Sequence, residues 1–223
     1  MSNNCVISSI FKAVRQSFPL VAPLIVVGVA GCGTFQTTPT PMQTGLEIRP
    51  SVEDKDAGLV GMAPGFSLAQ YQLLVVEPFK VDRLEAKGDI SPQEMQGYFH
   101  VKLLQRLQEA GVFKQIVEGP AAKVSQAAGS GRALILRGVI TELDPGSRAL
   151  RYFIGFGAGA TKAQIETQFV DLDANRVVVA TADRRAAAFG VFGGDSRQYL
   201  TESLDEMAKG LTELLKRIAK AKP

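Results

Sequence analysis

The fold is decided by Ala133-Leu-Ile-Leu-Arg-Gly-Val-Ile-Thr-Glu-Leu143, in which apolar residues fall on both faces of an extended chain. A strand that is apolar on both faces has to be covered on both, which places it in the middle of a sheet. It leads into Asp144-Pro-Gly-Ser147, which predicts a turn with proline at the second position and glycine at the third. We therefore expect the chain on either side to supply the neighbouring strands.

Two further strands are predicted after this turn, as a hairpin. Residues 162–172 alternate between apolar and polar side chains, and residues 176–184 continue as a valine-rich strand. Asp173-Ala-Asn175 between them predicts a tight turn, so the numbers of paired residues should sum to about 348. Asp195 then suits the cap of a long C-terminal helix that packs across the sheet. Its apolar stripe comprises Leu200, Leu204, Met207, Leu211, Leu215 and Ile218.

A strand–helix–strand unit is predicted before the central strand. Residues 71–81 are a mostly apolar strand, in which Pro78 requires an end, a bulge or an edge position. The helix that follows is capped by Ser91 and ended by Gly111. Residues 112–117 form a short second strand, and a crossover of this length favours parallel pairing. The apolar face of the helix comprises Met95, Phe99, Leu103, Leu107 and Ala110.

These elements predict an α+β fold. We expect a mixed β-sheet of about five strands, built as a β-α-β unit followed by an antiparallel meander, with two long helices packed on it. This single domain is assigned to residues 66–223, which are enough for one hydrophobic core. Residues 33–65 are rich in Thr, Pro, Gln and Gly, with few apolar residues at periodic positions. Their composition predicts that residues 32–65 form a flexible tether.

The first 31 residues have the pattern of a secretory signal. Lys12 and Arg15 precede an apolar run of thirteen residues, 18–30, and no acidic residue occurs in this region. Spanning a bilayer takes about twenty apolar residues. We therefore expect the segment 1–31 to be cleaved off, and a retained N-terminal anchor helix is the alternative.

The apolar run ends at Val29-Ala-Gly-Cys32, which resembles the lipobox of a bacterial lipoprotein. The resemblance implies cleavage between Gly31 and Cys32 and attachment of diacylglycerol and an N-acyl chain, such as palmitate, to Cys32. Two or more acyl chains hold a protein lastingly on a membrane. The residue after Cys32 is Gly33 rather than Asp, which in enteric-type sorting implies the outer membrane, with the domain facing the periplasm.

Composition argues against several classes of function. Two of the 25 basic residues lie in the signal, so 23 Lys and Arg face 22 Asp and Glu afterwards, and this near neutrality gives no indication of nucleic-acid binding. The cysteines are Cys5 and Cys32, so neither a disulfide nor a cysteine metal site is expected in the mature chain. His100 is the single histidine, which leaves metal binding and His-dependent catalysis unsupported. Ser-Lys and paired-carboxylate chemistry stay open, although no motif indicates either.

Gly155-Phe-Gly-Ala-Gly-Ala160 satisfies the G-x-G-x-x-A pattern of a dinucleotide-binding turn. That turn needs a following helix to hold the pyrophosphate, whereas the residues after Thr161 alternate like a strand. We interpret the pattern as a chance match and expect no nucleotide, no other cofactor and no metal.

The same segment carries a family resemblance. Arg151-Tyr-Phe-Ile-Gly-Phe-Gly-Ala-Gly-Ala160, with residues 144–147 before it and 170–173 after it, is similar to the core signature of the domain-of-unknown-function 4410 (DUF4410) lipoproteins, over about residues 70 to 218. The family has no assigned catalytic residues to carry over. By topology alone, the order of elements is also similar to periplasmic domains of curli-secretion and peptidoglycan-synthase-activator lipoproteins, which act through protein contacts.

Two glycine-aromatic segments should meet where the hairpin extends beyond Lys162. Glycine at this density indicates bulges or the close approach of another backbone. The aromatic side chains form an apolar patch if they are exposed, and packing into the end of the core is the alternative. The candidate interaction surface comprises Phe153, Gly155, Phe156, Gly157, Gly159, Phe189, Gly190, Phe192 and Gly193.

Basic residues are expected near the same end of the hairpin. A solvated rim is the favoured interpretation, and anionic headgroups or cell-wall polymer are alternative partners. The residues are Arg148, Arg151, Lys162, Arg184 and Arg185.

Together these observations predict a lipid-anchored protein of the bacterial cell envelope that is not an enzyme. Its domain is expected to act as a structural or assembly factor, through a protein partner or self-association. The alternative is a binding module for a lipid or other apolar ligand. A closed apolar pocket between the sheet and the C-terminal helix would favour the binding module, and an exposed apolar patch would favour the assembly factor.

Overall fold

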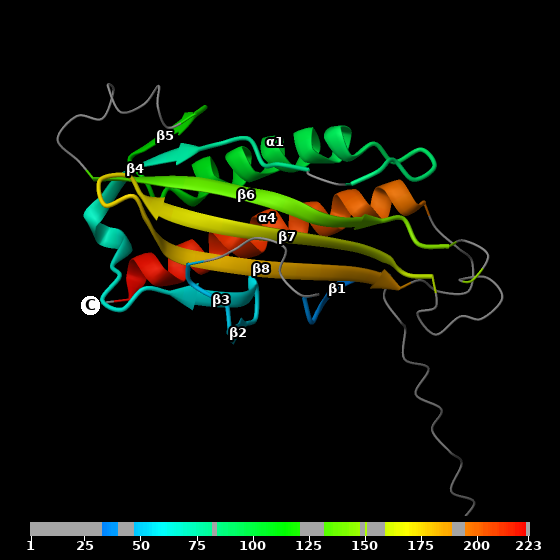
Figure 1. Ribbon diagram of the computed structural model, residues 1–223, viewed down its shortest axis with the longest axis horizontal. Coiled ribbons are helices and arrows are strands. Elements are labelled where there is room, and N and C mark those ends of the chain that lie inside the picture. Colours follow the sequence, from blue (N-terminus) through cyan, green and yellow to red (C-terminus); the bar gives the residue numbers. More distant parts are fainter. Residues whose placement is uncertain are drawn as a thin grey trace, which may run out of the picture. The chain divides into compact units, whose positions relative to one another are not determined.

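The computed structural model describes residues 33–39, 47–81, 84–120, 132–147, 150, 159–188 and 195–221. The predicted signal peptide lies outside these residues. All of the described residues belong to one compact unit of the chain, Gly31–Pro223. In Figure 1 this unit is a twisted sheet with two helices lying along one of its faces.

Within the described part of the chain, eight strands form one sheet, in the order β2-β3-β8-β7-β6-β4-β5, with β1 paired to β8 beside this path. β4 pairs in parallel with β5 and β6, and the other neighbours are antiparallel. The α+β class is therefore confirmed, and the count of about five strands is wrong. The strands are β1 (Gly33–Thr37), β2 (Val52–Asp54), β3 (Gly58–Met62), β4 (Tyr71–Val76), β5 (Gln115–Glu118), β6 (Arg132–Asp144), β7 (Thr161–Asp171) and β8 (Arg176–Ala188).

The three additional strands come from the segment predicted to be a flexible tether. Residues 33–37 of β1 pair with residues 184–188 of β8, and residues 59–62 of β3 pair with residues 179–182. The tether prediction for residues 32–65 is therefore wrong over β1, β2 and β3. Composition did not reveal these strands because β1 and β3 are held by backbone hydrogen bonds to the edge of β8, and β2 by those to β3, and such bonds require little apolar periodicity.

The central strand and the proline position are as predicted. β6 lies between β7 and β4, and Pro78 follows the end of β4 at a bulge. Val76 pairs with Leu136 and Lys80 with Val139. Between these two pairs, the segment after β4 therefore contains one residue more than β6. The extra residue turns the ring of Phe79, 1% exposed, into the core. It lies over Gly138, where a Cβ would come within 2.3 Å of that ring.

The predicted hairpin and its register are confirmed. From Thr161 opposite Ala187 to Phe169 opposite Val179, the numbers of paired residues sum to 348. The register then shifts by one before the turn, where Asn175 has a φ of 47°. Asparagine tolerates this left-handed conformation better than most residues, because its short polar side chain bonds locally.

Both predicted helices are present with their caps. The side chain of Ser91 accepts a hydrogen bond at the start of α1 (Pro92–Ala110), which ends at Gly111 with a φ of 60°. The side chain of Asp195 caps α4 (Ser196–Lys220) in the same way. The predicted stripes face the sheet: Met95, Phe99, Leu103 and Leu107 of α1, and Leu200, Leu204, Met207, Leu211 and Leu215 of α4, are buried, while Ala110 and Ile218 are partly buried.

Apolar clusters lie on both faces of the sheet, as the central strand required. Leu134, Leu136 and Ile140 of β6 belong to the large cluster beneath the helices. Ala133 and Ile135 belong to a smaller cluster on the opposite face. The larger cluster contains residues of both helices, so α4 packs on the sheet beside α1 (Figure 1).

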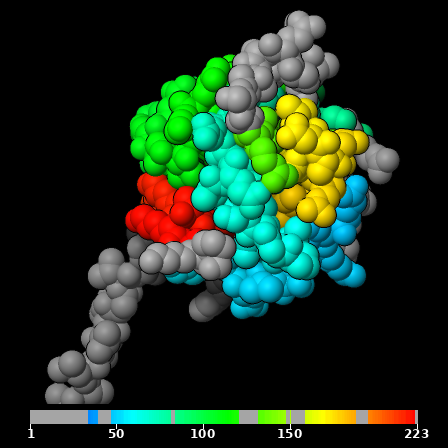
Figure 2. Space-filling view, turned by 90° about the vertical axis from the view of Figure 1, so that its left-hand side faces the viewer, coloured from blue at the N-terminus to red at the C-terminus, as the bar shows by residue number. Residues whose placement is uncertain are grey.

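An ion-pair clasp, formed by Arg217 with Asp54 and Asp56, joins the β2–β3 hairpin to the end of α4. Arg217 donates to both carboxylate oxygens of Asp54 at 2.6 Å and also to the carboxylate of Asp56. Burial raises the pKa of each aspartate, but the bonds and charge of Arg217, with Lys55 at Asp56, outweigh it and hold both pKa values below 3.8. In Figure 2 the last turns of α4 (red) lie beside the chain that follows β3 (cyan).

We expect Leu211→Ala to destabilise the protein by about 2–5 kcal/mol, because Leu211 is 3% exposed between α4 and the sheet. The measurement is the thermal midpoint. Val101→Ala is the matched control, because Val101 is 64% exposed on α1 and its truncation should leave the midpoint nearly unchanged. Equal midpoints for the two variants would show that α4 is not part of the core.

We expect Asp54→Asn to lower the free energy of unfolding at pH 7 by about 1 kcal/mol, near the upper end for a partly exposed ion pair. Because the folded-state pKa of Asp54 is depressed, its stabilisation is present at neutral pH and is lost as the pH falls through that pKa. The difference from the wild type should therefore shrink as the pH falls from 5 toward 2. Glu53→Gln, at an exposed neighbour, is the control; a pH-independent effect of Asp54→Asn would contradict the assignment.

Candidate functional site at the Gly33 end of the sheet

Most residues predicted to have a functional role lie outside the described part of the chain. Whether the glycine-aromatic segments meet therefore stays a prediction. Within the candidate surface the structure describes Gly159. The others, with the cleavage and lipidation residues, are Gly31, Cys32, Phe153, Gly155, Phe156, Gly157, Phe189, Gly190, Phe192 and Gly193.

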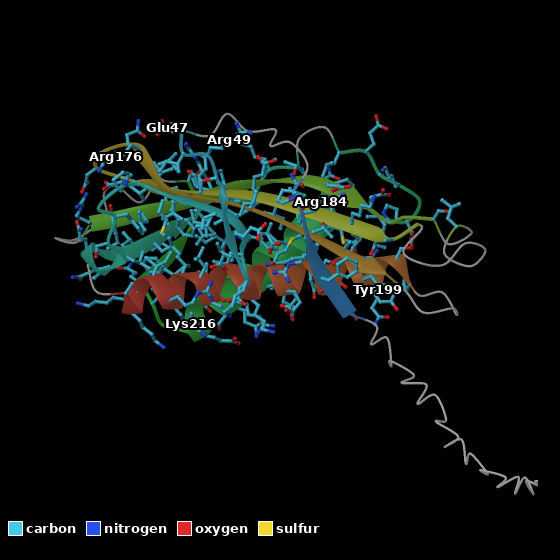
Figure 3. The ribbon with its side chains drawn as sticks, turned by 90° about the horizontal axis from the view of Figure 1, so that it is seen from below. Glu47, Arg49, Arg176, Arg184, Tyr199 and Lys216 are labelled. Atoms are coloured by element: carbon cyan, nitrogen blue, oxygen red, sulfur yellow. The ribbon has the colours of Figure 1, made fainter. Side chains whose placement is uncertain are left out.

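The described residues show where these segments leave the sheet. β1 begins at Gly33, the residue after Cys32, and Gly33 pairs with Ala188 at the end of β8. Thr161, the first residue of β7, pairs with Ala187. Cys32 and the two glycine-aromatic segments are therefore attached to the same end of the sheet, called here the Gly33 end. Figure 3 shows β1 (blue) with one end near Tyr199 of α4 and the other near Arg184 of β8.

Gly159 takes part in a close approach of two backbone segments at this end. Its φ is 73°, and its carbonyl accepts a hydrogen bond from the backbone of Ser147 at 3.1 Å. Gly146 lies against the same carbonyl: a Cβ added to Gly146 would be only 2.1 Å from that oxygen. The φ of Gly146 is 69°, as the predicted turn at 144–147 requires. Glycine at these two positions thus serves intramolecular packing.

Arg184 is not part of a solvated rim, so that prediction is wrong for it. Its guanidinium donates to both carboxylate oxygens of Glu142 at 2.7 and 3.2 Å, and to the hydroxyl of Thr37 at 3.2 Å. The Arg184 side chain is only 14% exposed. Because Glu142 is in β6 and Thr37 in β1, Arg184 ties three strands together across the sheet.

Arg185 points to the opposite face, beneath α4, since successive strand residues alternate. It forms a buried pair with Asp183, with nitrogen–oxygen distances of 2.9 to 3.1 Å, and also donates to the carbonyl oxygen of Asp56. Burial raises the pKa of Asp183 more than the charge and hydrogen bonds of Arg185 lower it. The rim prediction is therefore wrong for Arg185 too, and Arg148 and Arg151 lie outside the described residues.

The interior beside this pair is nearly filled. The hydroxyl groups of Thr167 and Thr181 lie 2.6 Å apart. A cavity of about 10 Å³ adjoins these threonines and Asp183, and reaches Met207 and Leu211 of α4. A space of that size holds at most a single water molecule. The described residues therefore form no ligand-sized pocket at this place between sheet and α4.

Other functional patterns have structural explanations. The ring of His100 lies 2.8 Å from the carboxylate of Glu118. In the ranges that the structure describes, no group of three His, Cys, Asp or Glu residues is placed to hold a metal ion. A strand, β7, follows Ala160, so the glycine motif lacks the helix that a dinucleotide site needs. None of the described helices is long and apolar enough to cross a membrane.

Sequence reasoning missed the partners that organise this region. The buried Asp183 lies two residues before Arg185 on one strand, a spacing that places both side chains on the same face and could have indicated the pair. Asp54 and Asp56 were included in the predicted tether. Their contacts with Arg217 span more than 160 residues, so no local signal could reveal them.

Several solved structures resemble the chain at low similarity. The PelC dodecamer from Paraburkholderia phytofirmans is 16% identical, with a TM-score of 0.42, covering 68% of this chain and 95% of that one. Protein XCC0632 from Xanthomonas campestris is 10% identical, with a TM-score of 0.46 and coverages of 71% and 91%. Lipoprotein GNA1162 from Neisseria meningitidis is 13% identical, with a TM-score of 0.33 and coverages of 67% and 98%. These values support no conclusion about function.

The family comparison is more specific. No curated protein matches the chain. A family model does match residues 85–194, a range that includes α1, β6, β7, β8 and the glycine-aromatic segments. Residues 85–194 therefore belong to the family Domain of unknown function (DUF4410), which confirms the resemblance over this stretch.

Proposed function

We propose that this protein is a lipoprotein of the bacterial cell envelope, anchored through Cys32 to the outer membrane and facing the periplasm. Its α+β domain acts there as a structural or assembly factor, by contact with a protein partner or a second copy. One observation carries the proposal: the residue that follows the lipobox-like Val29–Cys32 is the first residue of a sheet strand.

This arrangement fixes the domain relative to its anchor. All five residues of β1 pair with β8, and Thr37 is bonded in addition by Arg184. An acyl group on Cys32 is then attached one residue from the sheet, rather than through the long flexible linker expected from composition. A domain held in this way has a restricted position and orientation, which suits a scaffold better than a module that searches for distant partners.

The interior of the domain counts against the alternative of an apolar-ligand binding module. The described cavity between sheet and α4 has a volume of about 10 Å³, whereas ligand pockets are typically about 300–1,000 Å³. A larger surface hollow of about 550 Å³ is lined by β1 and the β2–β3 hairpin. Its lining combines Gln36, Glu53, Asp54 and Lys55 with Pro39 and Leu59, so it is a mixed, open surface hollow rather than a closed apolar pocket.

The two arginines near the end of β8 are engaged in structural contacts, which gives no support to an enzyme. The buried Arg185 is occupied by Asp183 and the carbonyl of Asp56, and Arg184 is occupied by Glu142. These contacts connect β8 to β6 and to the β2–β3 hairpin. We infer that they stabilise the domain and take no part in a reaction.

The glycine-aromatic segments remain our proposed association surface. They continue from Gly159 and from Ala188, at strand ends that lie next to each other through the Thr161–Ala187 pair. If the numbers of paired residues continue to sum to 348 beyond β7 and β8, Gly157 lies opposite Val191. Aromatic side chains gathered beside an anchored strand would suit contact with a partner or a second copy.

We expect Cys32→Ala to abolish acylation and lipoprotein-type cleavage. The measurement is mass spectrometry of the intact protein from the membrane fraction. The wild type should start at Cys32 and carry the mass of its acyl groups, whereas the variant should retain residues 1–31. Cys5→Ala is the control, since Cys5 lies inside the predicted signal and should leave acylation unchanged. A wild-type mature protein without lipid would refute the anchoring.

We expect Phe156→Ser with Phe192→Ser to abolish association of the lipidated protein while its thermal midpoint stays within a few degrees. Association is measured by chemical cross-linking in cells and by sedimentation in detergent. The control is Val52→Ser with Val101→Ser, which removes two apolar side chains that are 67% and 64% exposed elsewhere. A wild type that is monomeric and captures no partner, or a double variant that unfolds, would refute the proposed surface.

A further inference from the structure

Two large apolar side chains are exposed at the Gly33 end of the sheet. Phe35 is 48% exposed in β1, two residues after Gly33. Leu150 is 46% exposed, and its backbone N–H donates to the hydroxyl of Ser147 at 3.3 Å. Ser147 in turn is bonded to Gly159 beside the start of β7. Phe35 therefore lies near the point where the chain leaves the sheet toward Cys32, and Leu150 lies on the β6–β7 connection at the same end.

The covalent chain limits how far Phe35 can be from a lipid on Cys32. Consecutive Cα atoms of an extended chain advance by about 3.3 Å, so three residues span at most ~10 Å. The headgroup layer on each side of a bilayer is ~5–7 Å thick. If Cys32 is acylated, as proposed above, Phe35 is within reach of the headgroups without any unfolding of β1.

Met62 provides a contrast on the same edge of the sheet. It is 51% exposed in β3 and pairs with Val179 of β8. Val179 is nine residues from Ala188, the partner of Gly33, which corresponds to ~30 Å along the strand. Two equally exposed apolar side chains thus lie at very different distances from the anchor.

Distance from the anchor, rather than net charge, distinguishes the Gly33 end from the long edge. The edge carries the β2–β3 hairpin, whose acidic residues are offset by Lys55 and, through the ion-pair clasp, by Arg217. Both helices start at the Gly33 end, where Arg197 of α4 pairs with Glu94 in the first turn of α1. The partial positive charge of the two helix N-termini lies there, next to three acidic residues of α4 that line a hollow with Thr34 of β1.

We propose that the domain stands end-on on the membrane that holds its lipid, with the Gly33 end of the sheet against the headgroups. Phe35 and Leu150 contact the headgroup layer, and the β2–β3 hairpin stays in water. This orientation rests on the proposed acylation of Cys32 and adds to it which surface the lipid bilayer covers. The opposite end of the sheet, around the Asp173–Asn175 turn, then faces away from the membrane.

The test uses the acylated protein with one added cysteine. Cys5 leaves with the signal and the sulfur of Cys32 is bonded to lipid, so an engineered cysteine is the single reactive thiol. Phe35→Cys, Leu150→Cys and Met62→Cys proteins are labelled with an environment-sensitive fluorophore. They are then reconstituted in vesicles of phosphatidylethanolamine and phosphatidylglycerol that contain headgroup spin-labelled lipid. Quenching at positions 35 and 150 should exceed quenching at position 62 at least threefold.

Each other result has a defined meaning. Equal quenching at positions 35 and 62 would show an edge-on domain and overturn the proposal. Quenching that is absent at both positions 35 and 150 would show a domain held off the bilayer and would also overturn it. Failure of the anchor itself is recognised separately, because an unacylated protein has no lipid mass and does not float with the vesicles. Unchanged thermal midpoints confirm that the labelled variants are folded.

Discussion

The free edge of β8 is the constraint on which the arrangement of the domain depends. β8 is thirteen residues long and pairs with β7 along one side. Its other side would expose a row of unpaired backbone groups, which proteins avoid leaving open to other chains. β3 covers residues 179–182 of this edge and β1 covers residues 184–188. The N-terminal chain is therefore built into the sheet, and the residue predicted to carry lipid is joined directly to it.

Asp183 lies at the boundary between these two edge strands, where several parts of the domain meet. Gly58 packs there so closely that a Cβ would lie 2.4 Å from the carbonyl oxygen of Ala182. Arg185 links Asp183 to the carbonyl of Asp56. Gly210 of α4 lies against the same carbonyl, because a Cβ added to Gly210 would be only 2.1 Å from its oxygen. A buried ion pair gains little net stability after desolvation. Its contribution here is to fix how the hairpin, the sheet and α4 fit together.

If Cys32 is acylated as proposed, the connection between lipid and domain is short, and this has consequences for function. A long flexible linker would let the domain sample many distances from the membrane, whereas β1 restricts it to one end of the sheet. The glycine-aromatic segments start from that same end, beside Gly33 and Thr161. With Cys32 acylated, any partner that they contact would lie close to the membrane surface. The nearly filled space between sheet and α4 is consistent with a role performed by the outside of the domain.

The sequence by itself determined both helices, their caps, the five strands from β4 to β8 and the register of 348, because each rests on local periodicity or a local turn. It also supplied the lipobox-like motif and the DUF4410 signature. Only the tertiary structure decided that the N-terminal segment forms three strands, since edge pairing depends on distant backbone groups rather than on side-chain pattern. It likewise decided the partners of Arg184, Arg185 and Arg217, because alternation predicts which face a charge occupies but not the carboxylate that meets it there.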